Sequence, residues 1–376
     1  MIIKNAAVVC GDFKKRRTAL LIEKGLISEI SETIDGDDTV DFSGCTAVPG
    51  FIDVHIHGFG GGDVDDASEK SLEKMSFELA KRGITSFCPT TMTSPHDALL
   101  SQLGAVKAYI GKEKGAYIHG VNMEGPYISY EKKGAQDERF IRKPDIGEFL
   151  SLASVCDIVL VDVAPEVSGA CEFAREASKV CTVSAAHTAA SYDEAVKGFE
   201  SGFSHATHLF NAMTPVSQRA PGIIPAVFDS KTVTAEFICD GFHVHPSLIR
   251  SSFRLLGRDR TVVISDAMKA AGCPDGTYTL GGTEVFVKNG RALLKDGTIA
   301  ASTSNIYDEY KNLISFGIDE EQALRSCTIN PARVIGKDKI TGSIEKGKSA
   351  DILFLDGENN IRAVMIRGKF FDASGA

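Results

Sequence analysis

From residue 51 onward the sequence alternates short apolar runs with amphipathic stretches, and this alternation limits the possible folds more than any other feature. Such alternation is typical of parallel strands joined by crossover helices. Eight units at a spacing of roughly 27 residues predict an α/β fold, the (β/α)8 TIM barrel, which typically spans ~250 residues. The predicted strands are residues 51–57, 83–90, 117–124, 158–166, 181–187, 204–209, 233–240 and 261–266.

The two ends of the chain have a different sequence pattern. Residues 1–50 and the tail from about residue 340 form short strand-like runs broken by turn residues. Neither end is long enough to make a stable sheet domain alone, so we expect both termini (1–50 plus 340–376) to pair into one small β-sandwich domain. The barrel then occupies residues 51–339. Within it, Asn289-Gly290 between alternating apolar residues predicts a β-hairpin insertion at about 276–300.

Charge and cysteine content argue against several classes of protein. A formal net charge of −9 and a pI near 5.6 disfavour nucleic acid or an anionic membrane as the main partner. Nine scattered cysteines without a Cys-x-x-Cys motif indicate reduced thiols. The sequence shows neither a signal peptide nor an apolar run long enough to span a membrane, so we expect a soluble, cytoplasmic protein.

Polar residues gather at the predicted carboxyl ends of five strands, which is where a TIM barrel assembles its active site. Each alone could be an ordinary hydrogen-bonded group at a strand end, and an isolated His-x-His pair usually is. Together, imidazole and carboxylate donors without cysteine predict a catalytic site for Zn, Fe, Ni or Mn that leaves positions open for water and substrate. The set is His55, His57, Glu124, His187, His208 and Asp266.

A metal at this rim can bind water, lower its pKa towards neutrality and polarise a carbonyl group. Asp266 would then take a proton from that water and return it to a leaving group. The sequence contains no Gly-x-Ser-x-Gly motif that would supply a different nucleophile. We therefore expect hydrolysis at an unactivated carbon centre, typically an amide. His205 lies three residues before His208, on the opposite side by strand parity, and is interpreted as structural.

Six blocks of sequence carry a family resemblance, namely residues 49–57, 123–127, 208–213, 240–243, 330–332 and 342–351. The first block with the Glu/His/His/Asp series and the last two blocks resemble the amidohydrolase superfamily. The blocks Met-Glu-Gly-Pro-Tyr, His-Leu-Phe-Asn-Ala-Met and Asp-Gly-Phe-His resemble, more narrowly, the N-acetylglucosamine-6-phosphate deacetylase family. The match covers essentially the whole chain, and the His-Leu-Phe-Asn-Ala-Met block is quite specific.

The resemblance implies a role for each candidate ligand. Glu124, His187 and His208 match the principal metal ligands, and Asp266 matches the general base and acid. Family members with both first-strand histidines resemble dinuclear sites, so a second metal on His55 and His57, bridged by Glu124, is expected. The implied cofactor is a divalent metal, one or two ions per subunit, with Zn, Fe, Mn, Ni and Co all open.

The resemblance also implies an activity, hydrolysis of the acetamide of N-acetylglucosamine 6-phosphate in amino-sugar metabolism. His243 would stabilise the oxyanion, and Arg219 resembles a phosphate-binding arginine that reaches in from a neighbouring subunit, which implies a homodimer. A surface salt bridge is the other interpretation of Arg219. Gln136 stands where other members carry His. The implied substrate contacts are Gln136, Asn211, Ala212, Arg219, His243, Ala300 and Ala301.

Two alternatives stay open from the sequence. The first keeps the chemistry and changes the sugar to N-acetylgalactosamine 6-phosphate, which sequence separates poorly. The second is a catalytically inactive amidohydrolase fold that serves as an assembly protein. The complete ligand set and an intact Asp266 argue against this second alternative.

Overall fold

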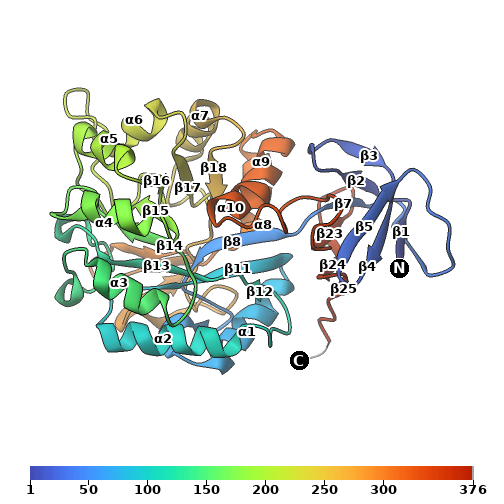
Figure 1. Ribbon diagram of the computed structural model, residues 1–376, viewed down its shortest axis with the longest axis horizontal. Helices are drawn as coiled ribbons and strands as arrows, with labels where there is room; N and C mark the ends of the chain where they lie inside the picture. Colours follow the sequence, from blue (N-terminus) through green and yellow to red (C-terminus); the bar gives the residue numbers. More distant parts are fainter. Residues whose placement is uncertain (375–376) are drawn as a thin grey trace.

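The computed structural model describes residues 1–374, and its elements fall into a large α/β region and a smaller region of strands at one side (Figure 1). The large region begins directly after Gly50, where β7 (Thr46–Pro49) ends and β8 (Phe51–Ile56) starts. Glycine is required at this junction because a Cβ atom there would lie 2.2 Å from Oγ1 of Thr85.

A parallel sheet forms the centre of the large region. Within residues 1–374 it contains nine strands in the order β12-β11-β13-β14-β15-β16-β17-β18, with β8 paired to β11. Each of the eight strands predicted from the sequence overlaps a strand of this sheet. Their bounds are β11 (Ile84–Thr91), β12 (Tyr117–Ile118), β13 (Val121–Tyr127), β14 (Ile158–Val163), β15 (Thr182–Ala185), β16 (Phe203–Ala206), β17 (Thr234–Phe237) and β18 (Thr261–Val263).

The carboxyl end of β8 also approaches the segment that follows β18. Ile56 and Ala267 form an isolated parallel bridge. The backbone N–H of Asp266 donates to the carbonyl of His55, and that of His57 donates to the carbonyl of Ala267, both at 2.9 Å. These bonds hold the carboxyl end of β8 beside the segment that follows β18.

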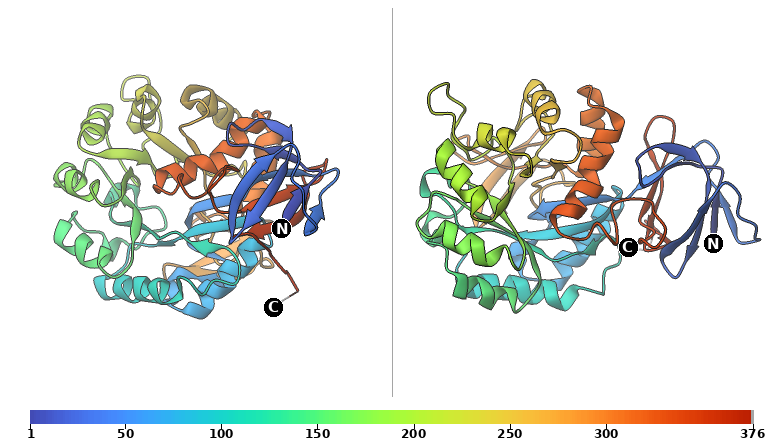
Figure 2. Two further views of the ribbon diagram at one scale, coloured as in Figure 1. Left: turned by 45° about the vertical axis from the view of Figure 1, so that its right-hand side comes forward. Right: turned by 45° about the horizontal axis from the view of Figure 1, so that its top comes forward.

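Helices surround the strands, as the left view of Figure 2 shows. Successive side chains of a strand point to opposite faces, and β8 therefore contributes to two apolar clusters. Phe51 belongs to the main core between the sheet and the helices. Ile52 and Val54 belong to a second cluster, which includes residues of the last helix. The helices are α1 (Glu69–Ala80), α2 (His96–Tyr109), α3 (Ile146–Ala153), α4 (Ala170–Ala177), α5 (Tyr192–Glu200), α6 (Ile223–Asp229), α7 (Pro246–Leu256), α8 (Ile306–Ser315), α9 (Glu320–Cys327) and α10 (Ile329–Val334). None of the described helices is long and apolar enough to cross a membrane.

Several strand ends differ from the prediction. The third predicted strand is broken in two at Gly120, whose φ of 142° few other residues adopt. Its second part, β13, continues past Glu124 to Tyr127 because Tyr127 pairs with Val163. The predicted ends at His187, His208 and Asp266 were wrong, since β15, β16 and β18 stop two or three residues earlier.

Strands from the two ends of the chain lie side by side and are drawn in blue and red at the right of Figure 1. One sheet has the order β25-β24-β23-β7-β2-β3, and in it β23 pairs antiparallel with β7. A second sheet has the order β5-β4-β1-β6. The bounds are β1 (Ile2–Lys4), β2 (Ala7–Val9), β3 (Lys15–Arg17), β4 (Ala19–Glu23), β5 (Leu26–Ser31), β6 (Thr39–Asp41), β23 (Ile352–Leu355), β24 (Ile361–Ile366) and β25 (Lys369–Phe370).

A separate antiparallel sheet follows β18. Its order is β19-β20-β21-β22, with β19 (Gly276–Leu280), β20 (Thr283–Lys288), β21 (Arg291–Leu293) and β22 (Ile299–Ala301). The two residues between β20 and β21, Asn289 and Gly290, both have positive φ, as a tight hairpin turn requires. A short hairpin of β9 (Gly58–Phe59) and β10 (Gly62–Asp63) follows β8.

Candidate active site

Glu124 lies at the centre of the candidate site and contacts histidines from three strands. Its Oε1 atom is 3.0 Å from Nε2 of His187 and 3.0 Å from Nε2 of His208. Its Oε2 atom is 3.3 Å from Nε2 of His57. Glu124, His187 and His208 are all buried, and their ligand atoms lie within 4.8 Å of one another. We call these three residues group A.

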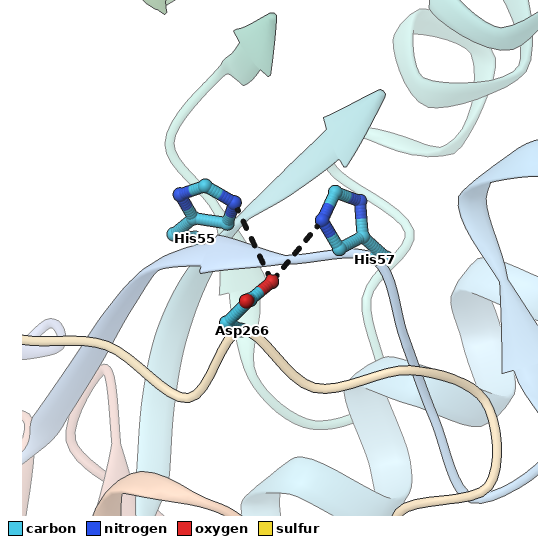
Figure 3. A group of neighbouring side chains, drawn as sticks. All are labelled: His55, His57 and Asp266. Atoms are coloured by element: carbon cyan, nitrogen blue, oxygen red, sulfur yellow. Dashed lines mark ion pairs between the residues drawn. The ribbon is translucent and has the colours of Figure 1, made fainter. Parts of the chain in front are cut away.

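A second group, group B, consists of His55, His57 and Asp266 (Figure 3). The Oδ1 atom of Asp266 lies 3.3 Å from Nε2 of His57 and 3.7 Å from Nε2 of His55. Nε2 of His55 is also 3.6 Å from Oε1 of Glu124. The carboxylate of Glu124 therefore lies beside both groups, and the structure brings all six predicted ligands together.

Hydrogen bonds to the other ring nitrogen fix the tautomers of three histidines. Nδ1 of His187 lies 2.8 Å from the carbonyl of Lys132, and Nδ1 of His57 lies 3.1 Å from the carbonyl of Thr90. Nδ1 of His55 lies 3.2 Å from a carboxylate oxygen of Glu236. Because these acceptors cannot donate, each Nδ1 carries a proton, and Nε2 is the ring nitrogen directed into the site as a possible ligand.

This donor set fits a bound cation. Nε2 of His187 and Nε2 of His208 face each other at 3.2 Å and share one carboxylate oxygen. Nε2 of His55 has no hydrogen-bond partner among residues 1–374 although it is buried. Lone pairs and carboxylate oxygens that converge without donors between them repel one another, and a divalent cation removes that repulsion.

The carboxylates and histidines of the site stabilise each other's charged forms. Burial alone would raise the pKa of Glu124, but the surrounding histidines hold that pKa well below its usual value. Burial would likewise lower the pKa of His55, but the carboxylates of Glu124 and Glu236 outweigh it and raise that pKa to about 10. Burial would raise the pKa of Asp266, but its hydrogen bond with His57 and the charges of His55 and His57 together lower it. Ionised carboxylates in a buried site favour a cation there.

Three of the candidate ligands lie in left-handed backbone just after their strands. The φ angles are 45° at His187, 33° at His208 and 48° at Asp266. Non-glycine residues rarely adopt this region, because it costs of order 1–3 kcal/mol per residue and persists only where the surrounding structure enforces it. The side chains of His187 and His208 contact Glu124 and that of Asp266 contacts His57, so the strained backbone accompanies the convergence of the ligands.

A cavity of about 350 Å³ opens above the two groups. Its floor includes His57, Glu124, His187, His208 and Asp266. The walls come from the loop after β13, the loop after β16, the segment before α7 and the edge of the inserted sheet. The remaining lining residues are Met92, Gly134, Ala135, Gln136, Phe210, Asn211, Ala212, His243, Thr298, Ile299 and Ala300.

Among the predicted substrate contacts, Arg219 and Ala301 do not line this cavity. Arg219 is exposed in the loop before α6. Ala301 is buried in the apolar cluster of the inserted sheet. Its neighbour Ala300 lines the cavity, and successive residues of a strand face opposite sides.

Gln136 lines the cavity with both ends of its amide engaged. Its Oε1 atom accepts from the backbone N–H of Thr93 at 2.7 Å, which fixes the orientation of the amide. Its Nε2 group donates to Oε2 of Glu124 at 2.6 Å. In this structure Gln136 therefore orients a candidate ligand and has no free donor on the side of Glu124.

Two buried carboxylates next to the site were not predicted from the sequence. Glu236 in β17 contacts His55, and Asp162 in β14 forms with His55 and Glu124 a third set of possible ligands. His205, interpreted as structural, lies with Nε2 3.1 Å from Glu236 and belongs to none of the ligand sets found within residues 1–374. Glu236 and Asp162 could have been noticed in the sequence, because each is the single acidic residue of a mostly apolar strand. A buried charge without a partner is costly, so such a residue is expected to have one.

Comparison with known proteins identifies the family of the chain. Residues 46–371 match the model of the Amidohydrolase family, and the chain belongs to that family, whose members are metal-dependent hydrolases. Its relatives include an N-acetylglucosamine-6-phosphate deacetylase of Vibrio furnissii, 34% identical over 94% of this chain and 90% of the relative. An N-acetylgalactosamine-6-phosphate deacetylase of Escherichia coli O157:H7 is 33% identical over 85% of this chain and 86% of the relative.

A solved structure shows the same fold. It is an aspartate-to-alanine mutant of N-acetyl-D-glucosamine-6-phosphate deacetylase from Mycobacterium smegmatis, in complex with N-acetyl-D-glucosamine-6-phosphate. The TM-score is 0.93 with 29% identity, and the match covers 99% of each chain. The chain therefore has the α/β amidohydrolase fold of these deacetylases.

Proposed function

We propose that the chain hydrolyses the acetamide of N-acetylglucosamine 6-phosphate with water, releasing glucosamine 6-phosphate and acetate. The observation that carries this proposal is the convergence of two ligand groups on Glu124 at the floor of a cavity that also contains Asp266. The names of the relatives supply the substrate.

The proposed metal ligands are the residues of the two groups. Glu124, His187 and His208 would hold one divalent ion, and His55, His57 and Asp266 a second, with Glu124 available to both. Zinc, iron, manganese, nickel and cobalt all suit imidazole and carboxylate donors. A divalent ion bound there supplies Lewis acidity that polarises a carbonyl and acidifies water.

Two residues of the chain are proposed to act on the reacting atoms. Asp266 faces the cavity and, being ionised, can accept a proton from the attacking water and pass it to the departing amine. Nδ1 of His243 lies 2.7 Å from Oδ2 of Asp240, and its buried Nε2 has no partner among the described residues. Asp240 thus orients the His243 ring so that Nε2 is the nitrogen left for the substrate, and an N–H there would donate to the developing oxyanion.

The sugar phosphate is proposed to occupy the rest of the cavity. Asn211, Ala212 and Ala300 form part of its wall, but none of its lining residues is lysine or arginine. A phosphate dianion needs a cationic partner, and guanidinium suits it best. We propose that Arg219 of a second copy supplies this charge in a homodimer, since Arg219 is exposed and makes no ion pair within residues 1–374.

Arg219→Ala is expected to raise KM for the phosphosugar by roughly 10- to 100-fold, because a hydrogen bond to a charged group contributes ~1.5–3 kcal/mol. The kcat value should change little. Mixed dimers of Arg219→Ala and Asp266→Asn chains should recover about half of the wild-type activity per dimer, since one site then has both residues. Mixed dimers that keep the raised KM of the Arg219→Ala protein would contradict a contribution from the partner subunit.

The architecture proposed for this activity is a closed (β/α)8 barrel of residues 51–339 with a β insertion at about 276–300. The approach of β8 to the segment after β18 supports closure of the barrel. The pairing of β7 with β23 supports a small β-sandwich domain of residues 1–50 and 340–376. A cytoplasmic location is proposed as well, since the nine cysteines are unpaired.

A second candidate substrate is N-acetylgalactosamine 6-phosphate. The similarity to a relative named for that sugar favours it. Both sugars carry the acetamide and the phosphate, so the same metal groups and the same cationic partner would serve either one.

The test is release of acetate from each phosphosugar by metal-replete protein, with unphosphorylated N-acetylglucosamine as the control. We expect the highest kcat/KM for N-acetylglucosamine 6-phosphate and much lower turnover of the unphosphorylated sugar. Preference for the galactosamine epimer would replace the proposed substrate with the second candidate. No acetate from either phosphosugar while metal is bound would refute the deacetylase and favour a non-catalytic protein.

A further inference from the structure

We propose that Glu236 is a positioning residue that holds His55 ready for a cation in group B and thereby sets whether that group is occupied. The inference rests on the proposed metal-dependent function. Glu236 lies within β17, is fully buried, and does not line the cavity. It acts through other side chains rather than on a substrate.

Three donors from two strand regions converge on the Glu236 carboxylate. Its Oε2 atom is 3.2 Å from Nδ1 of His55 and 3.3 Å from the backbone nitrogen of His208. Its Oε1 atom is 3.1 Å from Nε2 of His205. In addition, the backbone N–H of Leu209 donates to the Glu236 carbonyl at 2.9 Å. One residue therefore contacts a ligand of group B and the backbone of a ligand of group A.

The contact with His55 determines the chemistry of that ring. An ionised carboxylate only accepts, so Nδ1 of His55 must carry a proton, which leaves Nε2 as the nitrogen that can bind a cation. Nε2 then faces Glu124 and Asp266 and finds no donor among residues 1–374. A carboxylate behind a metal-binding imidazole fixes the ring and raises its basicity, and loss of such a partner typically lowers metal affinity by about 10- to 100-fold.

His205 makes a conservative substitution possible. Nδ1 of His205 lies 2.6 Å from Oγ1 of Thr234, so this ring can move its proton to Nδ1 and accept at Nε2. In Glu236→Gln, the amide oxygen can therefore still accept from His55 while the amide nitrogen donates to His205. Glu236→Gln removes the charge and keeps the orientation of His55, whereas Glu236→Ala removes both.

The experiment is titration of chelator-treated protein with Mn²⁺ in a calorimeter, together with metal content per chain after dialysis. Wild-type protein should bind two ions per chain. Glu236→Ala should weaken only the second step, by about 10- to 100-fold, and Glu236→Gln should recover most of that loss. The binding step of group A should stay close to that of the wild type in both variants.

Glu309→Ala provides a matched control. Glu309 is also a fully buried carboxylate, it accepts the N–H of Cys239 at 2.8 Å, and it makes no hydrogen bond to a residue of group A or B. Its loss should lower the melting temperature and leave both Mn²⁺ steps in place. A merely structural Glu236 would give the same pattern.

The outcomes separate this inference from the proposed function. Two unchanged steps in Glu236→Ala, or only one ion per wild-type chain, would overturn the role of Glu236 and leave the deacetylase standing. Wild-type protein that binds no divalent ion would instead remove the metal-dependent function itself.

Discussion

Replacing Asp266 with asparagine is expected to lower kcat for acetate release by about 10²- to 10⁴-fold, the usual contribution of a positioned general acid and base. Asparagine has nearly the same shape and keeps an oxygen that can face His57, but it cannot carry a proton between water and the amine. Group A does not include Asp266, so the ion proposed there should stay bound while turnover falls. The measurements are steady-state kinetics and metal analysis of the same preparation.

Asp351→Asn is a suitable control for this experiment. Asp351 is also buried, but it bonds Tyr117 and Thr341 outside the cavity. This variant should lose stability and keep its kcat. Near-full activity of Asp266→Asn with metal bound would show that another group moves the proton. That result would contradict the proposed role of Asp266 and leave the proposed reaction unchanged.

The rim of candidate ligands could be predicted because it depends on local pattern. Apolar runs located the strands, and a polar residue near the carboxyl end of a run must lie at the same edge of a parallel sheet. His187, His208 and Asp266 follow their strands by two or three residues instead of ending them. That error left the prediction intact, because residues just beyond a strand still lie at its carboxyl edge.

The orientation of these ligands could not be predicted, because it depends on contacts between distant segments. Gln136 reaches Glu124 only because the loop after β13 folds back over the site and Thr93 fixes its amide. Glu236 meets His55 across 181 positions of sequence. In the sequence, Glu236 is simply an acidic residue in a strand, and only the pairing of β16 with β17 places it behind the ligands.

The same contacts predict a strong dependence of stability on metal. With the ions removed, Nε2 atoms of His187 and His208 face each other at 3.2 Å beside ionised carboxylates, or the rings must take up protons. An ion present at 100 to 1,000 times its Kd contributes about 2.7–4.1 kcal/mol per site to the free energy of unfolding. We expect chelation to lower the melting temperature by on the order of 5–10 °C, measured by calorimetry with and without a chelator.

Glu124→Gln is the variant that makes this result specific. Glu124 serves both groups, and its amide would place an N–H where a cation or a lone pair is needed. Its melting temperature should hardly respond to chelator, because neither group then binds an ion tightly. The contrary outcome is a wild-type melting temperature that is the same with and without chelator. It would show that protons, and not a metal, remove the repulsion between the convergent lone pairs. The assignment of both groups as metal ligands would then be wrong.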